Sequence, residues 1–253
     1  MHRPLNNKMK KTLVLLNHPD VKNHVPVTKW FTEQRLISMI DTYPTLFIKP
    51  NKGRIGTGIV RLRKSDGPFY EVHYYNQAEK YETIEQALIA VKEKMIPGKR
   101  YLIQQGIELA TVLDRPFDFR IIMHKMNGRW EKSAWCAKIS PPQMIVTNHA
   151  RGGIIISAEQ ALAVNKHLFD YKKALTELTD VCYRICTIFD DHFSFYTLGI
   201  DMAIDKNGHI WFIEANTMPD HAMFRKLGDP RIYRELVGKE REVLRKARNS
   251  LES

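Results

Sequence analysis

LGIDMAIDKNGHIWFIEAN, residues 198–216, consists of two runs of β-favouring residues that flank the sequence Asp-Lys-Asn-Gly. This pattern is a strong signal for a β-hairpin. Side chains alternate faces along a strand, so Glu214 and Asn216 share a face. A turn centred near residues 206–207 places Asp201 approximately opposite Glu214. The stretch therefore predicts that two carboxylates and an amide oxygen converge among apolar side chains.

Such a group of oxygen atoms favours a metal site. Like charges in an apolar setting are costly unless a cation neutralises them. Hard oxygen ligands suit Mg²⁺, which usually binds through one or two carboxylates together with substrate phosphates. The alternative is a hairpin whose polar face simply lies in water, and the hairpin by itself leaves both interpretations open.

A second stretch, FIKPNKGRIGTGIVRL, carries Lys49 at the end of a strand and then glycines at positions 53, 56 and 58. Glycines let backbone N–H groups approach an anion closely, and the lysine supplies a point charge. The loop is not a Walker loop, because no Gly-Lys-Ser/Thr ends it. The sequence predicts a glycine-rich flap over phosphates, with an ordinary β-turn as the alternative.

Three further segments are candidates for a binding site. The segment YLIQQGI at residues 101–107 is able to present backbone groups to an adenine edge, although a plain core strand is the alternative. Asp118 and Arg120 share one face of a strand, where an exposed ion pair is the alternative. In the segment NHARGG, Arg151 offers a bidentate fork for carboxylate or phosphate beside two glycines. His149 lies nearby, but a lone histidine in a sequence more often has a structural role than a functional one.

The remaining elements mix helices and strands without a regular βαβ alternation, which indicates an α+β fold. We expect a short buried strand at residues 12–16 and helical spacing over 27–43. A helix is also expected over 83–95, with a capping-box pattern. Pro97-Gly98 interrupts the chain and is the candidate boundary between two lobes. Further helices are expected over about 157–190 and 229–249.

Composition narrows the class of protein. The 253 residues are 43% hydrophobic, enough for a substantial core. No apolar run reaches about 18 residues, so no transmembrane helix is expected. The short apolar run near the N-terminus is no signal peptide, which predicts a cytoplasmic protein. Cys136, Cys182 and Cys186 give no disulfide framework, and the last two are expected to pack on one helix face.

The formal net charge of +11 is compatible with more than one class of partner. Nucleic acid is the usual interpretation of such a value. However, the basic residues are spread along the chain and no recognition motif accompanies them. An enzyme that handles ATP and acidic substrates would also be basic. Nucleic-acid binding is therefore the least favoured reading.

In their order along the chain, these motifs resemble the ATP-grasp superfamily, and more closely its endospore-coat-associated YheC/YheD-type branch. The match is carried by FIKPNKGRIGTGIVRL, YLIQQGIELA, RPFDFRI, VTNHARGG and the hairpin, and it covers about residues 27–234. The resemblance implies two α+β lobes with the nucleotide between them. The expected division is a short N-terminal segment, two lobes and a charged C-terminal helix, at residues 1–27, 28–97, 98–235 and 236–253.

The resemblance also implies roles for individual residues. Two lysines would contact the ATP phosphates, namely Lys29 and Lys49. The mobile phosphate loop would contain Gly53, Gly56 and Gly58. The adenine–ribose pocket would be lined by Gln104, Gln105 and Ile107, although many relatives have a glutamate where Gln104 stands. One or two Mg²⁺ ions would be held by Asp201, Glu214 and Asn216. The transferring phosphate or the substrate carboxylate would face Arg120, Asn148 and Arg151.

The activity implied by the resemblance is ATP-dependent ligation of a carboxylate to an amine through an acyl phosphate, with an amino acid or peptide as the expected substrate. Relatives usually carry a sizeable N-terminal domain, whereas only about 27 residues precede the matched region. The chain is expected either to be a minimal form or to borrow that surface from a partner protein or a second copy. The alternative function is an ATP-binding, spore-coat-associated structural protein without turnover.

Overall fold

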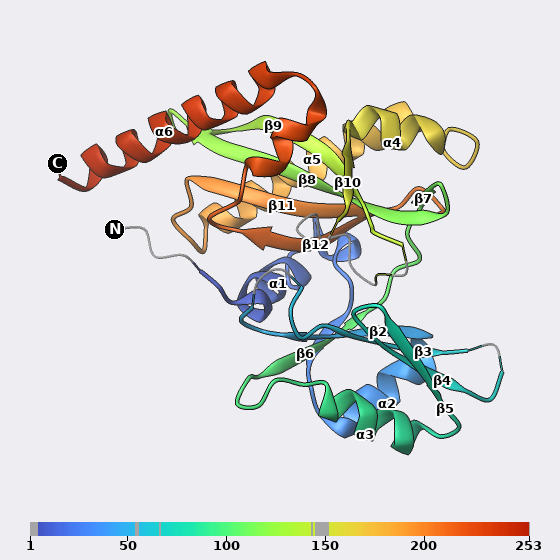
Figure 1. The fold of residues 1–253 in the computed structure, drawn as a ribbon. Coiled ribbons are helices and arrows are strands. Elements are labelled where there is room, and N and C mark those ends of the chain that lie inside the picture. The colour runs from blue at the N-terminus through green and yellow to red at the C-terminus, as the bar shows by residue number, and fades with distance from the viewer. Residues whose placement is uncertain (1–4, 54–55, 66, 143, 145–151, 253) are drawn as a thin grey trace.

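The computed structural model describes residues 5–53, 56–65, 67–142, 144 and 152–252. Within these residues the strands form two six-stranded, antiparallel sheets. The sheets lie one above the other in Figure 1, and α1 (Lys8–Leu16) lies beside the region where they meet. The expected α+β architecture with two lobes is confirmed.

The first sheet is covered by two helices, α2 (Glu33–Thr42) and α3 (Ile84–Glu93), which lie on its outer side in Figure 1. Its strand order is β1 (Thr28–Trp30), β6 (Tyr101–Gln105), β2 (Thr45–Pro50), β3 (Val60–Lys64), β4 (Tyr70–Tyr74) and β5 (Gln77–Tyr81). Leu46 and Ile48 are fully buried under the helices. Because faces alternate along β2, Phe47 and Lys49 point to the opposite face.

The second sheet carries a core on each face. Its strand order is β10 (Ile154–Ile156), β9 (Arg129–Ile139), β8 (Arg115–Met126), β11 (Thr197–Ile204) and β12 (Ile210–Asn216), and β7 (Thr111–Val112) pairs with β8. Phe119 and Ile200 pack with α4 (Ala158–Val164) and α5 (Tyr171–Asp190). Ile122 and Cys136 pack on the other face with η3 (Ala222–Leu227) and α6 (Pro230–Glu252).

Two predictions of secondary structure near the N-terminus were wrong. Residues 12–16 belong to α1, which Asn7 caps by accepting a hydrogen bond from the Lys10 backbone N–H. A run of five apolar residues has no diagnostic period, so it reads equally well as a strand or as part of a helix. Residues 27–43 form β1 and then α2, because the cap at Thr32 starts the helix only after the strand.

The predicted boundary at Pro97-Gly98 does not separate the two sheets. The strand that follows it, β6, pairs with β1 and β2 in the first sheet. The chain passes to the second sheet only after Gln105. At the N-terminus, η1 (Lys22–His24) and α1 add Leu15, Val21 and Val25 to the core of the second lobe. The first residues are therefore an integral part of that lobe.

The three cysteines are free and buried, as expected for packing residues. Cys182 and Cys186 lie together on the buried face of α5. Burial raises the pKa of Cys136 and Cys182 to about 12, so neither thiol ionises near neutral pH. Each helix within the described ranges is too short or too polar to span a bilayer.

Candidate functional site

The predicted hairpin is confirmed, and Asp201 pairs with Glu214 across it. The turn is fixed by Asp205, whose carboxylate accepts hydrogen bonds from the backbone N–H groups of Asn207 and His209. Beyond Asp201 the register shifts, so that Met202 pairs with Phe212. A β-bulge at Ile213 thus lets Phe212 enter the core while Glu214 faces the other side of the sheet.

Asp201 lies in a buried ion-pair network on that face. Its two carboxylate oxygens accept hydrogen bonds from Arg120, at 2.9 Å from Nε and 3.1 Å from Nη2. Lys138 Nζ lies 2.9 Å from an oxygen of Asp201 and 2.9 Å from an oxygen of Asp118. Asn216 donates a long hydrogen bond of 3.5 Å to Asp201. Asp118 and Arg120 thus lie in a buried network that centres on Asp201 and Lys138.

Charge, rather than solvent, keeps this carboxylate ionised. Burial by itself raises the pKa of Asp201, but the charges of Arg120 and Lys138 and their hydrogen bonds outweigh it. The pKa of Asp201 therefore lies below its ordinary value. The side chain of Asp201 is 10% exposed.

Helix α1 reaches the same end of the hairpin. Lys8 Nζ forms an ion pair with Glu214 at 3.0 Å, and it also donates to the Gly53 carbonyl at 3.3 Å. The Lys8 backbone N–H donates to the Asn51 carbonyl. Lys11, which is buried, donates to the Ala215 carbonyl. A single helix therefore bridges the glycine loop of the first lobe and β12 of the second.

A small cavity lies where α1 and the two sheets meet. It encloses about 10 Å³ and is lined by Lys8, Lys11, Thr12, Lys49, Leu102, Gln104, Phe212, Ile213, Glu214 and Ala215. That volume accommodates roughly one water molecule. The structure thus brings Lys49 of the first sheet and Glu214 of the second to one cavity.

Lys49 is held inside this cavity by a neutral partner. Its Nζ donates to the Gln104 side-chain oxygen at 2.5 Å, and the amide of Gln104 donates to Thr28 at 3.1 Å. Burial lowers the pKa of Lys49 to about 8, against the opposing charge of Glu214. Burial likewise lowers the pKa of Lys11 to about 8. The cavity therefore holds cations that lack a full complement of counter-charge.

Other predicted nucleotide-binding residues lie outside the cavity lining. Lys29 is opposite Ile103 in the β1–β6 register, whereas Lys49 is opposite Leu102, so the two lysines point to opposite faces of the first sheet. The side chain of Gln105 accepts a hydrogen bond from the Val27 backbone. Ile107 is half-buried on the chain that leaves β6. The register therefore gives no support to phosphate contact by Lys29.

The predicted glycine loop borders the cavity through Gly53. Gly56 and Gly58 have positive φ angles of 67° and 76°, which favour glycine. A Cβ at Gly58 would lie 2.8 Å from the Tyr101 hydroxyl and 2.9 Å from Ile96, so this position also needs glycine for packing. The predicted Asn148, His149 and Arg151 lie outside the described residues.

The oxygen donors near β12 suit Mg²⁺. Glu214 is 26% exposed and pairs with Lys8, whereas Asp201 is 10% exposed and has two cationic partners, so the Glu214 carboxylate is the more available of the two. Asn216 lies two residues further along the same strand, and Asp201 pairs with Glu214. Carboxylate and amide oxygens are hard donors of the kind that Mg²⁺ prefers. The residues present therefore fit this ion. Of the three, Asp201 has the strongest existing contacts, which are with Arg120 and Lys138.

Three lysines at the site were missed by the sequence analysis. Lys8 and Lys11 precede the run at residues 12–16, and the prediction of a strand there leaves out the helix that carries both lysines. Lys138 was overlooked although it is a lone charge in the apolar run from Ala134 to Ile139. A solitary charge in a central strand signals a buried ion pair, since an unpaired one would be costly.

A family model described as YheC/D-like ATP-grasp matches residues 1–242. Among curated proteins, the endospore coat-associated protein YheD of Bacillus subtilis (strain 168) is 27% identical over 226 residues, covering 86% of this chain and 49% of that protein. The endospore coat-associated protein YheC of the same organism is 20% identical over 214 residues, covering 81% and 57%. The chain spans about half the length of the curated relatives it matches.

A solved structure has the same fold. The crystal structure of D-alanyl-alanine synthetase A from Vibrio cholerae O1 biovar eltor matches with a TM-score of 0.56 and 15% sequence identity. The match covers 95% of this chain and 65% of that one. At this identity the likeness concerns the fold alone. Because the family model spans nearly the whole sequence, this two-lobed α+β chain belongs to the YheC/D-like ATP-grasp family.

Proposed function

We propose that this chain binds MgATP between its two sheets and uses it to join a small carboxylate to an amine. The observation that carries the proposal is the cavity in which Lys49 and Lys11 approach Glu214 from different elements. Membership of an ATP-grasp family supports the nucleotide, and a synthetase with the same fold supports the reaction class. An amino acid or peptide is the proposed substrate.

The phosphates of ATP are proposed to lie between the lysines and the hairpin. Within the described residues, the hydrogen-bond partner of Lys49 in the cavity is the neutral Gln104, so a bound anion would supply the counter-charge that Lys49 lacks. Gly53 and the loop that follows would approach the phosphates from the first lobe. Gln104 and Ile107 are proposed to border the adenine–ribose pocket, in keeping with their place on and after β6.

Glu214, Asn216 and Asp201 are proposed to hold one or two Mg²⁺ ions. When bound, Mg²⁺ supplies positive charge to the phosphate oxygens. Arg120 and Lys138 hold Asp201 in place and add positive charge near the hairpin. Arg151 and Asn148 are proposed to face the substrate carboxylate or the transferring phosphate.

In the proposed reaction an oxygen of the substrate carboxylate attacks the γ-phosphorus of ATP, and ADP leaves. The amine then attacks the carbonyl carbon of the acyl phosphate, and phosphate leaves. Catalysis of this kind rests on charge neutralisation and on holding the nucleophile in line. The chain supplies buried cations and oxygen donors for both purposes, and no covalent nucleophile is required.

Nucleotide binding requires movement of α1 or of the first sheet. A small-molecule site typically has a volume of roughly 300 Å³ or more. The volume of this cavity is about 10 Å³. Lys8 closes it by contacting Gly53 on one side and Glu214 on the other. We propose that parting of these contacts admits the nucleotide and that reclosing excludes water.

The test of the nucleotide site is the pH dependence of MgATP affinity. Lys49 is charged below pH 8 and loses its proton above it, so wild-type affinity is expected to be level between pH 7 and 8. Above pH 8 the loss of the Lys49 proton should lower the affinity by up to about tenfold per pH unit, and deprotonation of Lys11 adds to this slope. Lys49→Met should bind about 10- to 100-fold more weakly at pH 7, with a flatter profile. Isothermal titration from pH 7 to 9.5 measures both.

Lys52→Met is the matched control, because Lys52 is exposed on the same loop. It should bind MgATP like the wild type over the whole pH range. Lys11 also has a pKa of about 8, so it accounts for any dependence that remains in Lys49→Met. Equal affinities for the Lys49 and Lys52 variants would remove Lys49 from the proposed site.

A role without turnover is the second candidate, because the curated relatives are named as endospore coat-associated proteins. ADP release measured with and without a panel of amino acids and peptides separates the two. Ligation predicts release that depends on both a carboxylate and an amine, whereas a structural role predicts MgATP binding without release.

A further inference from the structure

A cluster of two histidines and a glutamate lies away from the nucleotide cavity. His124 comes from β8, Glu240 from α6, and His221 from the residue that precedes η3. Thr197 pairs with His124 across the sheet and lies four residues before Asp201 on β11. The cluster is therefore roughly 13 Å along the strand from the hairpin carboxylate. The proposed nucleotide chemistry makes no use of it.

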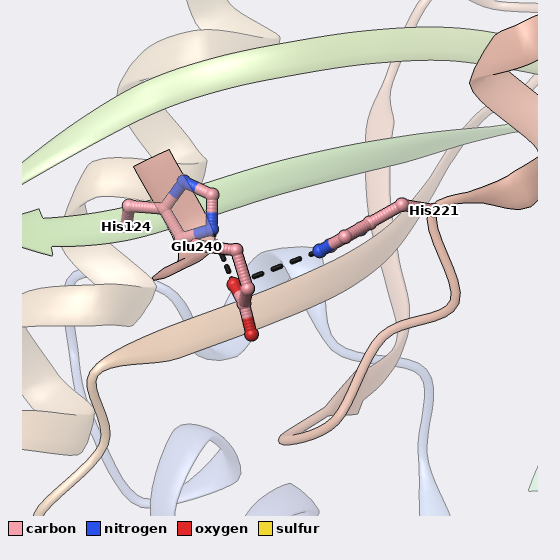
Figure 2. Close-up of side chains that lie close together, drawn as sticks. All are labelled: His124, His221 and Glu240. Atoms are coloured by element: carbon pink, nitrogen blue, oxygen red, sulfur yellow. Dashed lines mark hydrogen bonds and ion pairs between the residues drawn. The ribbon is translucent and has the colours of Figure 1, made fainter. Parts of the chain in front are cut away.

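The three side chains point at one another, as Figure 2 shows. An oxygen of Glu240 lies 2.6 Å from Nε2 of His124 and 3.6 Å from Nε2 of His221. One potential ligand atom from each residue falls within 4.8 Å of the others. Ligand atoms around a tetrahedral zinc ion are roughly 3.3 Å apart, given bonds of about 2.0 Å. The observed separations bracket that value, so small side-chain shifts would complete the geometry.

His221 has one long contact in this cluster. Its Nε2 lies 3.6 Å from the Glu240 carboxylate, an ion-pair contact that is longer than a well-formed hydrogen bond. Its Nδ1 is buried without a hydrogen-bond partner among the described residues. The side chain is nevertheless only 12% exposed. A buried imidazole is costly when one nitrogen is unpaired and the other has only a long contact, so a further partner at Nε2 would explain why the ring lies there.

The surroundings of the cluster hold the ligands in place. Ser133 lies 2.8 Å from Nδ1 of His124, which directs Nε2 of that ring toward the carboxylate. Thr197 donates to the same Glu240 oxygen at 3.0 Å. Hydrogen bonds to the outer side of ligating residues are usual at metal sites. Glu240 is 21% exposed, so an ion can reach the cluster and keep a water ligand.

We propose that His124, His221 and Glu240 bind a first-row divalent metal ion of the zinc type. Two imidazole nitrogens and one carboxylate form a donor set that suits Zn²⁺, whereas Mg²⁺ prefers oxygen ligands. The ion joins the sheet, α6 and the segment that follows β12. Since that segment begins directly after Asn216, the ion fixes the chain that leaves the hairpin.

The test is titration of tag-free, chelator-treated protein with ZnCl₂ in excess Mg²⁺, followed by calorimetry and thermal unfolding. The wild type should bind one ion and unfold at a higher temperature when it is bound. His221→Gln and Glu240→Gln should each weaken binding by at least about tenfold and lose the thermal shift. His167→Gln, an exposed histidine elsewhere, is the matched control and should behave as the wild type.

Cobalt(II) provides a second readout that does not depend on stability. The proposed site should give visible ligand-field bands without a thiolate charge-transfer band, because the three cysteines are buried elsewhere. The bands should disappear in His221→Gln while circular dichroism stays native. Absence of saturable zinc binding, or binding that survives both ligand substitutions, would overturn the proposal and leave a hydrogen-bonded contact between α6 and the sheet.

Discussion

Asp201→Asn is expected to lower the free energy of unfolding by about 3–5 kcal/mol. Asparagine keeps the shape of the side chain but removes the charge that Arg120 and Lys138 share. Arg120 and Lys138 are 12% and 7% exposed, so water cannot replace the lost counter-charge. Asp118 would remain the ion-pair partner of Lys138, and Arg120 would be left with the nearby charges of Asp118 and Glu214. Urea denaturation followed by circular dichroism measures the change.

The matched control for this substitution is Asp41→Asn. Asp41 forms an exposed ion pair with Lys64, and exposed pairs contribute little, so a change within about 0.5 kcal/mol is expected. Adding Lys138→Met to Asp201→Asn removes one surplus cation and should restore part of the lost stability. A loss below about 1 kcal/mol for Asp201→Asn, or no recovery in the double variant, would contradict the buried network as described.

Glu214→Gln should have the largest effect on turnover, with a fall of about 10²- to 10³-fold in Mg²⁺-dependent ADP release. The substitution keeps the size of the side chain and one of its oxygens, but it replaces the other oxygen with an amide NH₂ and removes the charge that the proposed magnesium site needs. Stability should fall by less than in Asp201→Asn, because Glu214 is 26% exposed, although Lys8 loses its ion pair and buried Lys11 and Lys49 lose an opposing charge. A coupled assay for ADP release at saturating ATP measures the effect.

Glu33→Gln serves as the control, because Glu33 lies in an exposed ion pair with Lys92 on the far side of the first lobe. It should retain wild-type turnover. Raising the Mg²⁺ concentration should recover part of the activity of Glu214→Gln if its metal affinity is the cause. Full turnover by a folded Glu214→Gln protein would exclude Glu214 as a metal ligand.

The part of the site that was predictable is the part with local signals. Asp-Lys-Asn-Gly fixes a turn, and the turn sets the pairing beside it, so the approximate approach of Asp201 to Glu214 could be predicted from the sequence alone. The bulge that places them directly opposite each other could not, because a regular register would put Asp201 opposite Ile213. Glycine and lysine around position 49 likewise marked the loop that borders the cavity. The helices with full apolar faces, such as α5, were also recognisable.

What could not be predicted depends on contacts between distant segments. Nothing local to Lys8 shows that it will lie against Gly53 and Glu214, and the short apolar run after it does not distinguish helix from strand. Lys29 shows the converse. Its contact with phosphate was implied by the family resemblance, whereas the face of the sheet on which it lies follows only from its pairing with Ile103. The cluster around Glu240 joins three segments over 116 residues.

The extra residue at Ile213 restricts how the last strand can pair. Before the bulge, alternate residues of β12, Ile210 and Phe212, face the core of the second lobe. After the bulge, Glu214 faces the opposite side of the sheet, where it pairs with Lys8. A slip by one residue in either direction would expel Phe212 or bury Glu214. The side chains before and after the bulge therefore alternate in opposite order, and one register places both sets on their correct faces. Misaligned pairings of β12 are less stable, which disfavours them as the chain folds.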